Sequence, residues 1–201
     1  MILRQILIIA IVLISLMDSV KAQTDDNLVI NCDSIFKING YQINLTRFDT
    51  QSDNESEFNS IFIFSRLINN KTVDIFKDSI FTRVQEVKFE DYNNDQIKDI
   101  LIQNYSDVRS NLTYYLYLVD TTNDKLIKVK GFEEIKNPKF NPDYNIVENY
   151  VMSGRNWTSF YKIDSDKIID FDITIFDGED DDGNFTYDEN YKKAINLIKD
   201  K

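Results

Sequence analysis

Apolar and polar residues alternate along most of this chain, and the apolar positions are rich in β-branched and aromatic side chains. Such alternation is typical of β-strands that bury one face. It predicts strands at residues 34–38, 41–45, 60–67, 72–76, 84–89, 100–103, 112–119, 125–129, 145–152, 157–163 and 167–175. The pattern therefore predicts an all-β fold of about ten short antiparallel strands, in a small propeller-like or sandwich arrangement.

Turn and helix signals lie between these strands. Asn39-Gly40 and Asn69-Asn70 each separate two predicted strands, and we expect a hairpin at both places. Residues 132–135 predict one helical turn, and residues 188–199 have the spacing of a short C-terminal helix. Residues 112–119 are apolar on both faces, which predicts a strand in the interior of the fold.

One polar stretch between two predicted strands has the spacing of a calcium loop. Asp91, Asn93, Asp95 and Asp99 place oxygen side chains at loop positions 1, 3, 5 and 9, and the carbonyl of Ile97 falls at position 7. A tight turn with this spacing points successive oxygens at one hard cation. We therefore expect these five residues to bind Ca²⁺.

The loop departs from the EF-hand pattern at two positions. Gln96 stands at position 6, where a sharp turn prefers glycine, and Ile102 stands at position 12 in place of a bidentate glutamate. A non-glycine residue at positive φ costs about 1 kcal/mol. The stretch is therefore not an EF-hand. The alternative to a calcium site is a solvated turn, because Asp and Asn also favour turns by bonding their own backbone.

The first 22 residues predict a secretory signal peptide. Arg4 precedes an apolar run at residues 6–17, and Val20-Lys21-Ala22 has the small residues that a signal peptidase recognises. The run is shorter than the roughly 20 residues that a helix needs to span a bilayer. We expect cleavage after Ala22, export to the periplasm or the extracellular space, and no membrane span after cleavage. Residues 23–201 are long enough for one β-rich domain.

Charge and composition narrow the classes of partner. The predicted mature part, residues 23–201, has 33 acidic and 21 basic residues and a net charge of −12. This charge disfavours nucleic acid and anionic lipid, and it favours cationic proteins and divalent metals. The chain has no histidine, which excludes Ser-His-Asp and Cys-His nucleophile systems and the usual zinc sites. Cys32 is the only cysteine, so no internal disulfide can form, and we expect its thiol to be buried.

Residues 84–176 resemble a known family in the order of their motifs. The acidic loop between two apolar strands is followed by Asn111, the aromatic run 114–119 ending at Asp120, and then residues 125–127, 132–138, 145–147, 153–155, 161–163 and 167–169. This order resembles exported bacterial β-propeller-like proteins that have one dockerin-type calcium loop and are related to FG-GAP/VCBS repeats. Some members of that family are immunity proteins that inhibit lysozyme-like peptidoglycan hydrolases.

The resemblance implies roles for particular residues of this chain. Asp91, Asn93, Asp95 and Asp99 would be the calcium ligands, and Asn111 and Asp120 would bracket the strand beside them. Gln96 departs from the usual glycine of the family. The residues before Val84 match no motif of the family.

Two further polar patterns are weaker. Asp180, Asp182, Asn184 and Asp188 offer side-chain oxygens, but the glycine of this stretch falls at position 4, so we expect an acidic turn and not a second calcium site. Arg155, in a predicted turn, is placed to contact a carboxylate on a partner. Seven Asn-x-Ser/Thr sequons would be glycan acceptors in a eukaryotic host, at Asn44, Asn54, Asn70, Asn104, Asn111, Asn156 and Asn184.

These observations lead to one hypothesis of function and two alternatives. We expect an exported, non-enzymatic, calcium-binding β module that binds a protein partner, and the resemblance implies that the partner is a lysozyme-like hydrolase. One alternative is a cell-surface adhesion or structural module. The other is a glycosidase, since two carboxylates suffice for that chemistry. The sequence marks no pair of carboxylates for this role and does not identify the partner.

Overall fold

The structure is a computed structural model that describes residues 26–38, 40–48, 58–179 and 186–199. Within these residues, twelve antiparallel strands form three sheets of four strands, and neighbours in each sheet are consecutive in the chain. Each sheet is therefore an up-and-down meander, the unit that forms one blade of a β-propeller. The predicted all-β class is confirmed.

The elements have the following bounds. The first sheet contains β1 (Asp26–Asn31), β2 (Tyr41–Arg47), β3 (Ser60–Ile68) and β4 (Lys71–Ile80). The second sheet contains β5 (Val87–Glu90), β6 (Asp99–Ser106), β7 (Leu112–Asp120) and β8 (Lys125–Lys128). The third sheet contains β9 (Pro138–Asn141), β10 (Ile146–Asn149), β11 (Trp157–Asp164) and β12 (Lys167–Phe176). The helical elements are α2 (Asp33–Phe36), the 3-10 helix η1 (Phe132–Glu134) and α3 (Tyr187–Lys199).

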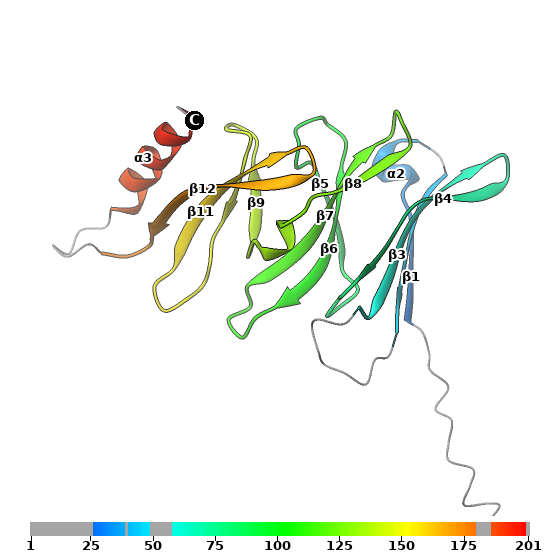
Figure 1. The fold of residues 1–201 in the computed structure, drawn as a ribbon, viewed down its shortest axis with the longest axis horizontal. Helices are drawn as coiled ribbons and strands as arrows, with labels where there is room; N and C mark the ends of the chain where they lie inside the picture. The colour runs from blue at the N-terminus through cyan, green and yellow to red at the C-terminus, as the bar shows by residue number, and fades with distance from the viewer. Residues whose placement is uncertain (1–25, 39, 49–57, 180–185, 200–201) are drawn as a thin grey trace, which may run out of the picture.

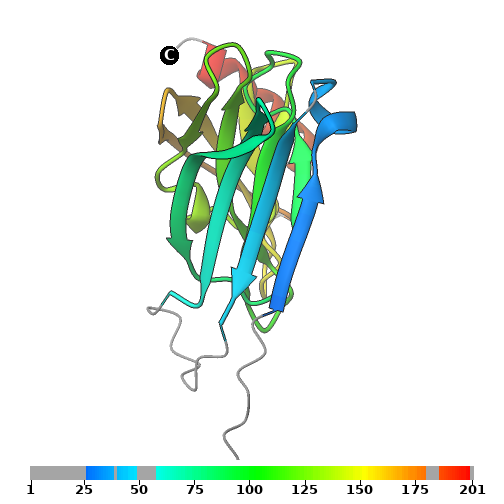
Figure 2. The same ribbon diagram turned by 90° about the vertical axis from the view of Figure 1, so that its right-hand side faces the viewer.

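The three sheets and helix α3 are stacked in layers along the long axis of the molecule (Figure 1). One cluster of buried side chains joins the first sheet to the second, another joins the second sheet to the third, and the last joins the third sheet to α3. Figure 2 looks onto the first sheet and shows its four strands side by side in front of the other layers. The second sheet is therefore covered on both faces.

Strand β7 shows how the sequence produces a sheet with two buried faces. Leu116 and Leu118 belong to the cluster shared with the third sheet, whereas Tyr117 and Val119 belong to the cluster shared with the first sheet. Successive side chains of a strand point to opposite faces, so an apolar residue at every position covers both. The predicted interior strand at residues 112–119 is confirmed.

The prediction for residues 34–40 is wrong. The sequence predicts a strand at residues 34–38 and a hairpin at Asn39-Gly40, but Asp33–Phe36 form helix α2, and β2 pairs with β1 instead. The helical turn buries the ring of Phe36 at 5.7 Å from that of Tyr41. Lys37 ends the helix in the left-handed region, at a φ of 56°. A short apolar run does not distinguish a helical turn from a strand, and packing in the first cluster decides the outcome here. Asn39 itself lies outside the described residues.

Two edge strands are not predicted from the alternation of apolar and polar residues. Neither β1 nor β9 is predicted, and each pairs with only one neighbouring strand. Strand β9 begins at Pro138, which has no N–H to donate, and a sheet accommodates proline at the first residue of an edge strand.

The C-terminal helix is confirmed, with Ala194, Ile195 and Ile198 buried against the third sheet. The predicted signal peptide, residues 1–22, lies outside the described residues.

Candidate metal centre

The predicted calcium loop joins β5 to β6 at one end of the stack (Figure 1). Tyr92, the second residue of the loop, anchors it in the cluster between the second and third sheets. Its ring lies 5.3 Å from that of Phe132 and 5.8 Å from that of Phe140, and its hydroxyl donates a hydrogen bond of 3.1 Å to the carbonyl of Pro138. The loop is thus fixed by a buried aromatic side chain at its base.

The side chains of the loop fold its backbone into successive turns. The Asp91 carboxylate accepts hydrogen bonds from the amides of Asn94 (2.7 Å) and Gln96 (2.8 Å). The Asp95 carboxylate accepts a hydrogen bond from the amide of Ile97 (2.7 Å). Asn94 and Gln96 adopt left-handed φ values of 61° and 70°. The position that favours glycine in calcium loops therefore has positive φ here, and Gln96 fills it at a conformational cost.

Asp99 ties the loop to the sheet. It is the first residue of β6 and has 0% exposure. One carboxylate oxygen accepts a hydrogen bond of 2.8 Å from the Tyr92 amide, and the other accepts one of 3.0 Å from the Val119 amide. Burial raises the pKa of Asp99 to about 7, and the charges of Asp95 and Asp91 add to this increase, whereas the two amide hydrogen bonds oppose it. Asp91 and Asp95 therefore lie near enough to Asp99 to disfavour its charged form.

The loop has the donor chemistry of a calcium site but not a closed cage. Asp91, Asn93, Asp95, Ile97 and Asp99 offer only oxygen ligands, which suit Ca²⁺. However, the Asn93 amide nitrogen donates a hydrogen bond of 2.8 Å to the Asp95 carboxylate, so these two side chains bond each other. Among the described residues, no group of three or more His, Cys, Asp or Glu side chains is arranged to hold a metal ion. Binding of Ca²⁺ therefore requires the Asn93 and Asp95 side chains to turn toward a common centre.

A cleft opens beside the loop, between the second and third sheets. Its volume is about 400 Å³, and it is lined by Tyr92, Asn93, Leu118, Ile127, Phe140, Asn145, Ile163 and Ser165. The lining is mainly apolar, with the amides of Asn93 and Asn145 and the hydroxyl of Ser165 as its polar groups. The cleft and the loop share Asn93, so a change in the loop alters the wall of the cleft.

The turns around the loop carry further aspartates. Asp120 caps the turn after β7 by accepting hydrogen bonds of 3.0 Å from the amides of Thr122 and Asn123. Asp143 lies in the exposed turn between β9 and β10. Asp91, Asp95, Asp120 and Asp143 take part in no ion pair with another described residue. We call the end of the stack that carries these four residues the aspartate-rich end.

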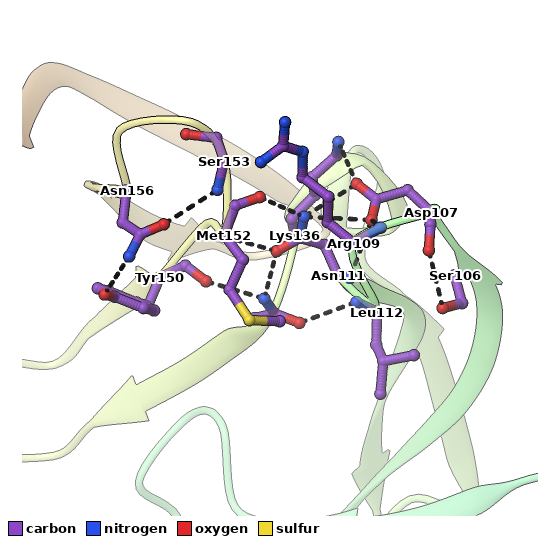
Figure 3. A network of polar contacts seen from close by, with 11 residues as sticks. Ser106, Asp107, Arg109, Asn111, Leu112, Lys136, Tyr150, Met152, Ser153 and Asn156 are labelled. Carbon is purple, nitrogen blue, oxygen red and sulfur yellow. Dashed lines mark hydrogen bonds and ion pairs between the residues drawn. The ribbon is translucent and has the colours of Figure 1, made fainter.

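Asn111 lies at the opposite end of β7 and joins two sheets (Figure 3). Its side chain donates hydrogen bonds to the Asp107 carboxylate (2.9 Å) and to the Met152 carbonyl (2.9 Å), and its oxygen accepts one from the Met152 amide (2.8 Å). Asn137 donates a further hydrogen bond to the same oxygen (2.8 Å). Asn111 is only 1% exposed, so its sequon cannot carry a glycan in the folded protein. The resemblance placed Asn111 and Asp120 at the two ends of this strand, but only the sheet pairing shows what Asn111 contacts.

The other candidate residues are separated from the loop. Asp180, Asp182 and Asn184 lie outside the described residues, and Asp188 is exposed in the first turn of α3. Arg155 is exposed in the connection between β10 and β11, with its guanidinium 5.0 Å from the ring centre of Phe176.

Comparison of this chain with family models, curated proteins and solved structures finds no match. No helix among the described residues is both long enough and apolar enough to cross a membrane.

Proposed function

We propose that the protein is an exported, non-enzymatic module that binds a basic, lysozyme-like hydrolase at its aspartate-rich end and inhibits it. The observation that carries this proposal is the placement of Asp91, Asp95, Asp120 and Asp143 in turns at one end of the stack, without cationic partners among the described residues. Unpaired carboxylates on a rigid scaffold steer and orient a cationic partner.

Calcium has a structural role in this proposal. The donor set of the 91–99 loop is composed of oxygen atoms, and the charges of Asp91 and Asp95 disfavour the charged form of Asp99, an effect that a bound cation would offset. We propose that Ca²⁺ orders the loop and with it the wall of the adjacent cleft. Asp99, because it already accepts hydrogen bonds from β7 and from the loop, would transmit that order to the second sheet.

Inhibition of a panel of basic lysozyme-like enzymes tests the proposal. The protein should inhibit at least one member in a saturable manner, and inhibition should weaken as salt screens the charges over a Debye length of about 8 Å at physiological ionic strength. The protein alone should not hydrolyse peptidoglycan or simple glycosides. Turnover that is lost on replacing one carboxylate outside the loop would instead establish a glycosidase.

A pair of variants with equal charge change localises the surface. Asp120→Asn/Asp143→Lys keeps an acceptor at the capping position of Asp120 and should weaken inhibition at least tenfold. Asp26→Lys/Asp188→Asn changes the net charge equally at exposed positions away from this end, on β1 and α3, and it should stay within twofold of the unmodified protein. Equal weakening by both variants would show nonspecific charge attraction and would contradict the proposal.

A further inference from the structure

The other end of the stack carries most of the described arginines. Strands β2, β4, β6, β10 and β12 all finish at the end that lies opposite the 91–99 loop (Figure 1). Four of the five arginines among the described residues follow or end these strands, namely Arg47, Arg83, Arg109 and Arg155. We call this surface the arginine-rich end. The topology thus collects arginines that are far apart in the chain on one surface.

None of the four arginines has an acidic partner among the described residues. Arg66, the fifth, lies near the opposite end and pairs with the Asp124 carboxylate at 2.5 Å. By contrast, Arg47 donates a hydrogen bond of 3.0 Å to the carbonyl of Arg83, and the Arg83 guanidinium lies 5.6 Å from the ring centre of Tyr105. The guanidinium groups of these four arginines therefore contact no carboxylate of the described residues and can bind one on a partner.

Exposed apolar side chains gather at the same end. Of the thirteen exposed large hydrophobic residues in the described part of the chain, six lie there: Phe58, Val84, Val108, Tyr150, Met152 and Phe176. Val108 is 100% exposed and stands next to Arg109 at the tip of the β6–β7 turn. Exposed apolar groups among polar ones mark interaction sites, and Arg, aromatic residues and Met are enriched in protein interfaces.

The tip that presents Val108 and Arg109 is held in place by hydrogen bonds. The Asp107 carboxylate accepts hydrogen bonds from the amides of Arg109 (2.9 Å) and Asn111 (3.0 Å). Asn111 then fixes the turn to Met152, in the connection between β10 and β11 of the third sheet, as Figure 3 shows. A surface that is ordered before binding loses less conformational entropy when a partner docks.

We propose that the arginine-rich end is a docking surface for a second protein, whose contact surface presents carboxylates around apolar side chains. Guanidinium groups bind carboxylates through paired hydrogen bonds, and the exposed Tyr150, Met152 and Phe176 provide the apolar contact. Nucleic acid is disfavoured because the chain's net charge of −11 repels a polyanion beyond the immediate contact. This surface is separate from the aspartate-rich end, so the proposal stands independently of hydrolase inhibition.

Binding to a random copolymer of glutamate and tyrosine tests this surface, since the polymer combines carboxylates with aromatic groups. The protein should bind it saturably at physiological salt, as measured by fluorescence titration. Arg109→Glu/Arg155→Glu should weaken binding at least tenfold, and Arg109→Gln/Arg155→Gln should weaken it by a smaller factor. The control Lys71→Glu/Lys192→Glu makes the same charge change as the glutamate variant at exposed residues of β4 and α3 and should stay within twofold. Circular dichroism confirms that each variant is folded.

Three kinds of result would overturn the proposal. The first is a failure of the copolymer test itself, either no binding or an equal loss in the lysine control. The second is tighter binding of heparin or single-stranded DNA than of the copolymer, which would identify a non-protein polyanion as the ligand. The third is concentration-dependent self-association in sedimentation that is lost in Arg109→Glu/Arg155→Glu, together with no copolymer binding. That result would make a second copy of this chain the occupant.

Discussion

The Asp78 carboxylate of β4 accepts a hydrogen bond of 2.9 Å from the hydroxyl of Tyr117 in β7, so a polar contact crosses the layer between the first and second sheets. Lys128 of β8 donates to the same oxygen at 2.7 Å. Burial raises the pKa of Tyr117 above its usual range, and the charge of Asp78 adds to the effect. The tyrosine is therefore held in its neutral, donating form.

Removal of this contact should destabilise the fold in a non-additive manner. Tyr117→Phe should cost about 1 kcal/mol, because it removes one hydrogen bond. Asp78→Ala should cost about 2 kcal/mol, because it leaves the Tyr117 hydroxyl without its acceptor. The double variant should lose less than the sum of the two. Urea unfolding provides the three values, and strictly additive costs would show that the two residues are not coupled.

Calcium should stabilise the folded protein. If the 91–99 loop binds Ca²⁺ only when folded, free calcium at about 100 times its dissociation constant should add roughly 2.7 kcal/mol to the free energy of unfolding. Asp95→Ala should abolish this gain. Thermal unfolding in calcium and in chelator gives the comparison, with calorimetric titration as a second measurement. Equal unfolding curves and a titration without heat would establish the loop as a solvated turn.

Gln96→Gly should stabilise the protein in chelator. The left-handed φ of 70° at Gln96 strains a residue with a Cβ by about 1 kcal/mol, and glycine relieves that strain at some entropic cost in the unfolded chain. Asn94→Gly is the matched control in the same loop, because its φ of 61° is one that asparagine tolerates. The gain should be larger at residue 96, as measured by unfolding midpoints. A loss of stability at residue 96 would contradict the strain argument.

Asp107 should make the fold sensitive to acid. The Lys136 ammonium at 2.8 Å and the Asn111 side chain stabilise its charged form, and they lower the pKa of Asp107 well below its usual range. A carboxylate with a lowered folded-state pKa contributes stability above its unfolded-state pKa, about 3.9, and loses that contribution as the pH falls below it. Asp107→Asn should therefore flatten the decline in urea midpoint below about pH 4. An unchanged decline would assign acid sensitivity to other carboxylates.

Cys32 should be unreactive until the first sheet opens. The thiol is 0% exposed, and burial raises its pKa to about 11. At pH 8 only about one thiol in a thousand is then ionised, and the thiolate is the reactive form. Labelling with a thiol reagent should be slow in buffer and fast in urea, at the rate of an exposed cysteine. Rapid, complete labelling of the native protein would contradict the packing around α2.

The sequence predicts those parts of the fold whose position follows from the pattern of apolar residues within a single strand. Residues 112–119 have apolar groups on both faces, and this alone predicts their position between two cores. The turn that becomes α2 has no such signal, because the burial of Phe36 against Tyr41 depends on a distant part of the first sheet. Strand β9 is hidden for a similar reason, since only its edge position makes Pro138 acceptable.

The two candidate sites also differ in how far the sequence predicts them. The spacing of Asp91, Asn93 and Asp95 is a local pattern, and the structure places these residues in one loop as expected. The bond between the Asn93 amide and Asp95 does not follow from spacing. The arginine-rich end could not be predicted either. Arg47 and Arg155 lie far apart in the chain, and only the meander topology brings them to one end of the stack.

The order of the strands also governs how the chain can assemble. Each sheet is built from consecutive strands, so its hydrogen bonds form between neighbours in the sequence and the entropic cost of closing each loop is small. A chain that emerges from its N-terminus can pair β1 to β4 before β5 exists, but Phe62 and Ile43 then remain uncovered. The second sheet ends this exposure and at the same time provides the surface for the third sheet. The first sheet therefore depends on the second sheet for its cover, and the third sheet completes a further core with α3.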